Sequence, residues 1–232
     1  MSVLSERKEE RLYKQVLENE IVSPRTYNMY LGGTIAYGLI INIIMCATCV
    51  DLVLSINPII FIIGYFICAI AGTFISAKSD KPAMSFLGYN LVVLPVGLVV
   101  TSAVYYYGGL SSYIVLEAFV YTACITCIMI CLSILKPEFF SKLGGILLGS
   151  LIGLIVVELV LMIFGVSQTI TTWAGVIIFS LYIGYDYWKA QQYPKTVDNA
   201  IDSALDIYLD IINLFLRLLS ILGGEKSSKN KF

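Results

Sequence analysis

Five polar side chains recur at helical spacing near the end of this 232-residue sequence. They are Asp202, Asp206, Asp210, Asn213 and Arg217, and steps of three or four residues confine them to one narrow arc of a helix. Apolar residues occupy nearly every other side of that helix. We predict that it is buried in a bundle with this polar stripe facing a cavity or another polar group. An amphipathic helix lying on a membrane surface is the alternative.

A further carboxylate, Asp186, ends the apolar run before this helix, and we expect it to lie opposite Asp210. Two carboxylates in a low-dielectric site cannot both ionise cheaply, so such a pair keeps a shared proton to a raised pH. At higher pH the two charges would repel or bind a hard cation such as Ca²⁺ transiently, with Asp206 as a third ligand. The pair is therefore predicted to be a pH sensor that opens a path between the two helices.

Two more carboxylates lie inside apolar runs, where an ionisable side chain is costly. Glu117 stands near the start of its run, and we expect it to have a structural role. Glu158 lies in the middle of its run, so it must be protonated or face a polar interior. We predict that Glu158 lines a pathway together with the stripe residues Asp202, Asp206, Asn213 and Arg217. Histidine is absent from the sequence, so proton chemistry must use carboxylates.

The elements that position these residues are apolar segments long enough to cross a bilayer. Hydrophobic residues make up 58% of the chain and charged residues 13%, against about 25% charged residues in soluble domains. We predict an all-α polytopic membrane protein, a seven-helix transmembrane bundle with a central C-terminal helix. The predicted spans are roughly 30–50, 56–77, 86–107, 113–135, 143–164, 169–187 and 204–222.

Lysine and arginine alternate between the connections in the way that the positive-inside rule requires for a cytoplasmic N-terminus. We therefore predict an integral membrane protein with its N-terminus in the cytoplasm, and we expect it in a bacterial plasma membrane. The last segment is the exception, because a full crossing places Lys226, Lys229 and Lys231 outside. A re-entrant hairpin is the alternative to the full crossing that we favour.

The predicted organisation is a cytoplasmic leader at 1–29, a transmembrane domain at 30–223 and a short polar tail at 224–232. The leader contains an expected amphipathic helix from Ser2 to Val22, with a solvated helix as the alternative. Pro95 is expected to kink the third span. Glycines at 145, 149 and 153 predict tight packing within the chain, with a homodimer face as the alternative. The six cysteines lie in apolar runs and are interpreted as packing residues rather than a metal or redox site.

The final helix is similar to the C-terminal signature of the Bax inhibitor-1 family, through the run Ala-Leu-Asp-Ile-Tyr-Leu-Asp-Ile-Ile-Asn-Leu-Phe-Leu at 204–216. The run Ile-Phe-Ser-Leu-Tyr-Ile-Gly-Tyr-Asp at 178–186 resembles the sixth-helix signature of that family, and weaker matches occur at 117–123 and 143–147. The resemblance spans roughly 25–223. It implies a seven-helix bundle around the last helix and a pH-sensitive calcium leak, with Asp186 and Asp210 as the sensor.

Two departures from the family pattern concern the sensor. Well-studied members carry an arginine on the second helix, whereas the run at 56–77 has no basic residue, and Asp206 stands where the family often has an uncharged residue. Both leave the sensor less positively compensated, with Arg217 as the nearest basic residue. We expect no cofactor, only permeant Ca²⁺ and protons, no nucleic-acid partner, and a monomer or weak homo-oligomer in the lipid bilayer.

Two other functions are alternatives. Tyr185-Asp186 imitates half of the catalytic pair of an intramembrane aspartyl protease, but Tyr208-Leu209-Asp210 lacks the glycines of the second half and no Pro-Ala-Leu motif occurs. A proton-coupled transporter using Glu158 with the stripe would be supported by inverted repeats, and none is evident. We therefore expect the protein not to be an enzyme.

Overall fold

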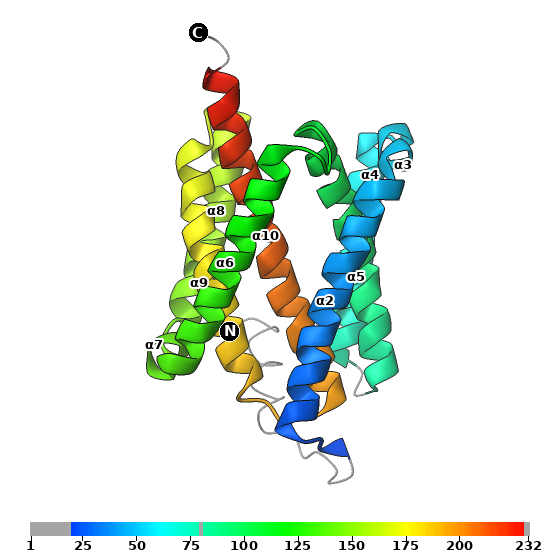
Figure 1. Cartoon of the computed structure of the whole chain (residues 1–232), viewed down its shortest axis with the longest axis vertical. Coiled ribbons are helices and arrows are strands. Elements are labelled where there is room, and N and C mark those ends of the chain that lie inside the picture. Colours follow the sequence, from blue (N-terminus) through cyan, green and yellow to red (C-terminus); the bar gives the residue numbers. More distant parts are fainter. Residues whose placement is uncertain (1–19, 79–80, 230–232) are drawn as a thin grey trace. The chain divides into compact units, whose positions relative to one another are not determined.

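The computed structural model describes residues 20–78 and 81–229, and all regular secondary structure in these ranges is helical (Figure 1). The predicted all-α class is confirmed. The predicted leader helix at Ser2–Val22 lies largely outside the described residues. The helices are α2 (Pro24–Thr48), α3 (Val50–Ser55), α4 (Pro58–Lys78), α5 (Pro82–Tyr106), α6 (Tyr113–Leu135), α7 (Pro137–Ser141), α8 (Gly144–Ile163), α9 (Thr169–Ala190) and α10 (Val197–Lys229).

Prolines mark the start of four of these helices, at α2, α4, α5 and α7. Proline suits the first turn because backbone N–H groups at that position have no acceptor within the helix, so the lack of an N–H costs no hydrogen bond. At α2 the Ser23 hydroxyl also accepts a hydrogen bond from the backbone N–H of Thr26 at 3.1 Å. This cap and Pro24 begin the helix six residues before the predicted first span at 30–50. Pro95 lies inside α5, which continues past it to Tyr106.

Helix α10, coloured orange to red in Figure 1, is longer than predicted at both ends. It begins at Val197 rather than 204, because the Thr196 hydroxyl accepts a hydrogen bond from the backbone N–H of Asn199 at 3.1 Å. It also runs through residues assigned to a polar tail. The helix continues through Gly223, whose missing side chain makes room for the Tyr107 ring.

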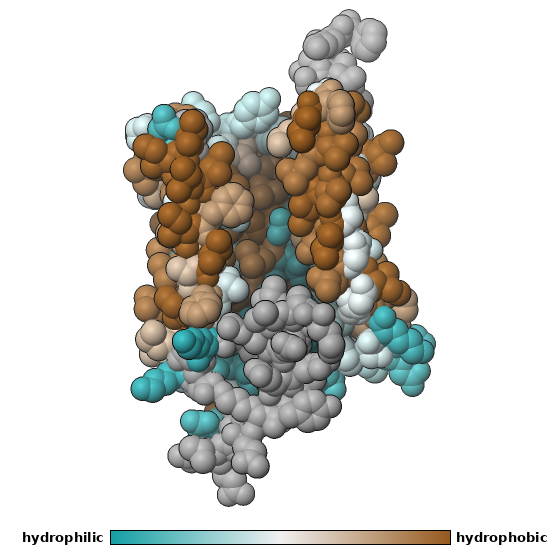
Figure 2. Space-filling model, turned by 180° about the vertical axis from the view of Figure 1, so that it is seen from behind, coloured by the Kyte–Doolittle hydropathy of each residue, from teal (hydrophilic) through white to brown (hydrophobic). Residues whose placement is uncertain are grey.

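Five of the described helices are long and apolar enough to cross a membrane, namely α2, α4, α5, α6 and α8. Their large apolar side chains are widely exposed: on α4, Ile59, Ile60 and Ile70 are each more than 65% exposed. Hydrophobic residues cover most of the described surface seen in Figure 2. Such a surface fits lipid and not water, so the chain is a polytopic membrane protein. Helices α9 and α10 carry more polar residues, and the count of seven crossings stays a prediction.

The chain packs as two compact units. Unit 1 contains residues up to Ser102 and Lys189–Tyr208, and unit 2 contains Ala103–Trp188 and the residues from Leu209 onward. The boundary in the last helix falls between Tyr208 and Leu209. Asp198, Asp202 and Asp206 therefore belong to unit 1, whereas Asp210, Asn213 and Arg217 belong to unit 2.

Within unit 1, α4 and α5 approach closely at two glycines. A Cβ atom at Gly72 would lie 2.6 Å from the carbonyl oxygen of Gly88, and one at Gly88 would lie 2.6 Å from the carbonyl oxygen of Gly72. Within unit 2, the side chains of Phe140, Leu143 and Leu147 form a core that fixes α7 and α8. The Phe140 ring fits against Gly184 of α9. The contact with Phe140 fixes the position of α9, which carries Asp186.

Two packing predictions were wrong. Among the described residues, no atom lies within 4 Å of a Cβ built at Gly145, Gly149 or Gly153, so these glycines do not form a close helix contact in this part of the chain. The close helix contacts use other glycines, because helices meet where their partner also has a small residue. Cysteines at 124, 127 and 131 are exposed on α6, and among the six free cysteines only Cys46 is buried.

Candidate functional site

The polar stripe of α10 is buried or partly buried. Asp202 is 4% exposed and Asp210 is 7% exposed, while Asp206, Asn213 and Arg217 are partly buried. A buried charge is costly unless other groups compensate it, so the partners of these residues decide what the stripe can do. The amide of Asn213 donates to the carbonyl oxygen of Leu209 on its own helix at 2.8 Å.

In unit 1, two serines hold the acidic residues at the start of α10. Ser76 on α4 donates a hydrogen bond to Asp202, and Ser85 on α5 donates to Asp198 at 2.5 Å. Both serines and both aspartates are buried. Hydrogen bonds to a carboxylate are stronger than neutral ones, so they tie α10 to α4 and α5. Asp198 was missed in the sequence because the helix was predicted to begin after it.

In unit 2, the two predicted sensor residues lie on consecutive helices, Asp186 near the end of α9 and Asp210 in α10. Each is 7% exposed. Their neighbours on the two helices include Ile183, Ile211 and Leu214, which are also buried. Both carboxyl groups are therefore shielded from solvent by apolar side chains.

Glu158 and Arg217 form an ion pair between α8 and α10. The guanidinium contacts both carboxylate oxygens, with Nη2 and Oε2 at 2.9 Å and a closer contact between Nη1 and Oε1. The side chains are about one-fifth exposed. A bidentate pair fixes orientation as well as charge. Both residues were predicted to line a pathway, with Arg217 as the basic residue nearest the aspartates, but the pairing of Glu158 with Arg217 was not predicted.

Arg217 also lies across α9. A Cβ atom at Gly175 would stand 3.0 Å from its Nε and 3.2 Å from its Cδ and Cζ, so the missing side chain at Gly175 gives the guanidinium its place. Three helices of unit 2 thus meet at Arg217: its own, α8 through Glu158 and α9 through Gly175. The ion pair therefore also holds α8, α9 and α10 together.

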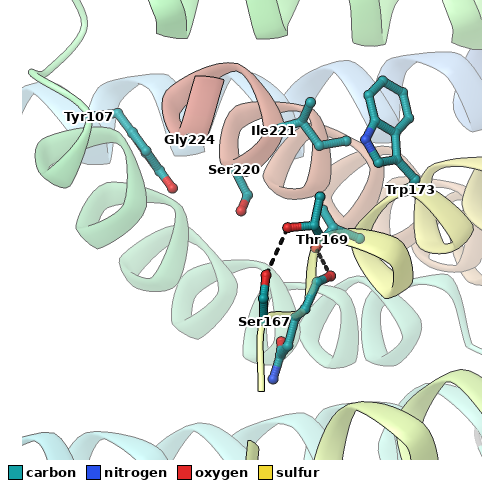
Figure 3. A pocket seen from close by; sticks show the side chains of 9 residues that line it. Tyr107, Ser167, Thr169, Trp173, Ser220, Ile221 and Gly224 are labelled. Carbon is teal, nitrogen blue, oxygen red and sulfur yellow. Dashed lines mark hydrogen bonds between the residues drawn. The ribbon is translucent and has the colours of Figure 1, made fainter. Parts of the chain in front are cut away.

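A pocket of about 540 Å³ lies at one end of unit 2 (Figure 3). Figure 3 shows Ser220 of α10 between Tyr107 and Trp173, with Thr169 of α9 close to Ser167. Among the described residues that line it, none is charged. Its polar groups include the hydroxyls of Tyr107, Ser167, Thr169, Thr172 and Ser220 and the amide of Gln168. Such a lining can hold water or an uncharged polar group.

In the described part of the chain, no three cysteine, aspartate or glutamate side chains come together in a group that could hold a metal ion. The described residues therefore contain no preformed three-ligand site at Asp186, Asp206 and Asp210. Transient Ca²⁺ binding there stays a prediction. The aspartates of α10 are divided between the two units, as the position of the boundary requires.

Lys195 fastens the connection between α9 and α10 in unit 1. Its ammonium group donates to the carbonyl oxygen of Gln191 at 2.8 Å and lies 4.4 Å from the centre of the Tyr27 ring. Its backbone carbonyl accepts from the N–H of Val22 at 2.8 Å. Partial burial lowers the pKa of Lys195 from its ordinary value, because desolvation disfavours the charged form.

An uncharged polar contact of unit 1 was also missed. The amide nitrogen of Asn42 on α2 donates to the hydroxyl of Tyr208 on α10 at 2.6 Å, and the two side chains are 3% and 0% exposed. The Tyr208 ring packs against the Tyr89 ring, with centroids 5.7 Å apart. The signal in the sequence is an asparagine within an apolar span, which needs a partner as a charge does.

We expect Tyr208→Phe to destabilise the protein by about 1–3 kcal/mol, because it leaves the buried amide of Asn42 without its acceptor. The measurement is the free energy of unfolding in mixed micelles, followed by circular dichroism. Tyr106→Phe is the matched control, since Tyr106 is 80% exposed, and it should change the free energy by less than about 0.5 kcal/mol. Equal effects of the two substitutions would contradict the role of the Asn42 contact.

Comparison with known proteins gives a consistent set of similarities. The profile of the family described as "Inhibitor of apoptosis-promoting Bax1" matches residues 20–227. The chain is 28% identical over 237 residues to the inner membrane protein YbhL of Escherichia coli, covering 90% of this chain and 97% of YbhL. It is 28% identical over 180 residues to Bax inhibitor 1 of Schizosaccharomyces pombe, covering 76% and 66% of the two chains. An uncharacterized protein of Helicobacter pylori is 30% identical over 172 residues, covering 68% and 70%.

Proposed function

Since this chain belongs to the Bax inhibitor-1 family of membrane proteins, we propose that it is a pH-sensitive calcium-leak channel gated by Asp186 and Asp210. The observation that carries the proposal is the burial of both carboxyl groups on consecutive helices of one unit. Two buried carboxylates share a proton at low pH and repel each other once it leaves. The shared proton holds α9 and α10 together, and its loss opens a path for the cation.

The other polar residues of the α10 stripe are proposed to line the path. Oxygen ligands suit a hard cation such as Ca²⁺, and carboxylate groups lower the energy of a cation in a low-dielectric region. The path residues that we propose are Asp202, Asp206 and Asn213, with the Glu158–Arg217 pair at its edge. In this proposal the N-terminus faces the cytoplasm, and Ca²⁺ moves down its electrochemical gradient without a resident cofactor.

Calcium flux into proteoliposomes tests the gate. With the wild type, the rate of flux should rise as pH increases through the titration of the pair. Asp210→Asn and Asp186→Asn cannot lose the gating proton at that position, so flux should stay low and nearly independent of pH. Glu117→Gln is the matched control, because it removes a carboxyl group whose contact is Tyr121 of its own helix at 3.4 Å; its pH profile should equal that of the wild type. Flux unchanged by Asp210→Asn would contradict the proposal.

The same preparations separate transport from catalysis. A protease that used Asp186 and Asp210 to activate water would cleave a membrane-helix substrate, and either Asp→Asn variant would abolish the cleavage. We propose that the protein is not an enzyme, so purified wild type should leave such a substrate intact while it conducts Ca²⁺. Cleavage that depends on the two aspartates would replace the channel proposal with the protease.

A further inference from the structure

The pocket at the end of unit 2 lies one helical turn from the Glu158–Arg217 pair. On α10, Ser220 and Gly224 of the pocket follow Arg217 at steps of three and seven residues, which places them on the same face of the helix. On α9, Thr172 of the pocket precedes Gly175, which adjoins the guanidinium, by three residues. On both helices, a residue that lines the pocket therefore lies about one turn from the position of the guanidinium.

A side chain of the pocket also reaches the other member of the pair. The amide of Gln168 donates to the backbone carbonyl oxygen of Glu158 at 3.4 Å. Glu158 on α8 is therefore linked to the pocket through Gln168, as Arg217 is through α9 and α10. Beyond the pair on the same face of α10 stand Asn213 and Asp210, four and seven residues before Arg217.

We propose that the pocket is an aqueous mouth and that the Glu158–Arg217 pair is a barrier separating it from Asn213 and Asp210. This inference rests on the proposed function, because it assigns a second closed point to the same path. The uncharged polar lining suits water and a hydrated cation, which it can admit without holding. At the inner end, the bidentate contact and the seat on Gly175 fix the guanidinium across the route.

The pair can close the route without trapping a cation, because its two charges neutralise each other. A lone Glu158 carboxylate would bind the cation, and a lone Arg217 guanidinium would repel it. Passage therefore requires the pair to separate or swing aside, which makes this point distinct from the Asp186–Asp210 gate. Removing one member of the pair should connect the pocket to the stripe.

Access to an introduced thiol tests the barrier. Ser220→Cys marks the pocket and Asn213→Cys marks the far side of the pair. Each is treated with a negatively charged, membrane-impermeant methanethiosulfonate reagent, which a lone Arg217 does not repel. Mass spectrometry locates the adducts, so the six native cysteines do not interfere. Intact cells and inside-out vesicles are compared first with Ser220→Cys, which identifies the face that exposes the pocket. Asn213→Cys is then labelled from that face alone.

With the pair intact, Ser220→Cys should label quickly and Asn213→Cys slowly. Adding Glu158→Gln should accelerate labelling at position 213 by about tenfold or more. The reason is that the substitution removes the ion pair that keeps the barrier closed. Adding Glu117→Gln should leave it unchanged. Rapid labelling at 213 with the pair intact, or no acceleration by Glu158→Gln, would overturn the inference.

A second variant keeps the test decisive if Glu158→Gln folds poorly. Glu158→Ala/Arg217→Ala leaves no unpaired charge and removes both side chains, so it should also accelerate labelling at 213; unchanged labelling would again overturn the barrier. Labelling needs no calcium. Flux that is indifferent to Asp210→Asn would therefore reject the proposed function, whereas indifferent labelling rejects the barrier alone.

Discussion

Glu158→Gln is expected to lower the free energy of unfolding by about 3 kcal/mol, the lower end of the cost of breaking a buried ion pair. The substitution removes the carboxylate that neutralises Arg217, whose side chain is only about one-fifth exposed in the pair. The lower end applies because water still reaches part of both side chains. The measurement is unfolding of the protein in mixed micelles by a denaturing detergent.

The double variant Glu158→Leu/Arg217→Met separates the pair from the cost of an unpaired charge. Replacing both charges by apolar residues of similar volume is often neutral or stabilising. We therefore expect it to recover most of the loss, whereas Arg217→Met alone should be as unstable as Glu158→Gln. Glu117→Gln, with its contact inside α6, should remain within about 0.5 kcal/mol of the wild type. A double variant no more stable than the single ones would show that the pair is not the source of the effect.

The second large effect is expected at Gly88. An alanine Cβ would lie 2.6 Å from the carbonyl oxygen of Gly72 and 2.8 Å from the backbone nitrogen of Ser76, both of α4. Backbone atoms cannot rotate away, so α4 and α5 must separate. Overpacking of this kind costs about 1–3 kcal/mol. Because Ser76 donates to Asp202, the shift also weakens the hold of α4 on α10.

Gly64→Ala is the matched control for Gly88→Ala. Gly64 lies on α4 with open space at its Cβ position. Alanine there removes the helix penalty of glycine, and we expect a gain of up to about 0.5–1 kcal/mol. The two Gly→Ala substitutions should therefore change the unfolding midpoint in opposite directions. A loss of stability at both positions would point to a general cost of the substitution rather than to the α4–α5 contact.

Most helices were predictable because a bilayer requires long uninterrupted apolar runs, and these are visible along the sequence. The span at 113–135 coincides with α6. Helix ends were less predictable where a cap decided them, as at Ser23 and Thr196. The C-terminal motif at 204–216 sufficed to identify the family.

The partners of the polar residues were harder to predict. Arg217 and Glu158 are 59 positions apart, and the sequence around either residue does not indicate that the other is its partner. Ser76, Ser85 and Asn42, which donate hydrogen bonds to α10, were not predicted because uncharged polar residues are common in membrane spans and do not stand out as ionisable ones do. Glycines were visible, but which of them meet a neighbour depends on the opposing helix, as Gly72 and Gly88 show.

The hydrogen bonds of α10 also bear on biosynthesis. The ribosome makes this helix after α2, α4 and α5, yet it carries Asp198, Asp202 and Tyr208, the partners of Ser85, Ser76 and Asn42. Until α10 has been synthesised, Ser76, Ser85 and Asn42 of the earlier helices lack these hydrogen-bond partners. Integration of the final segment should therefore be the step that commits the newborn protein to its fold, and a ribosome stalled before residue 197 should leave a product that quality-control proteases recognise.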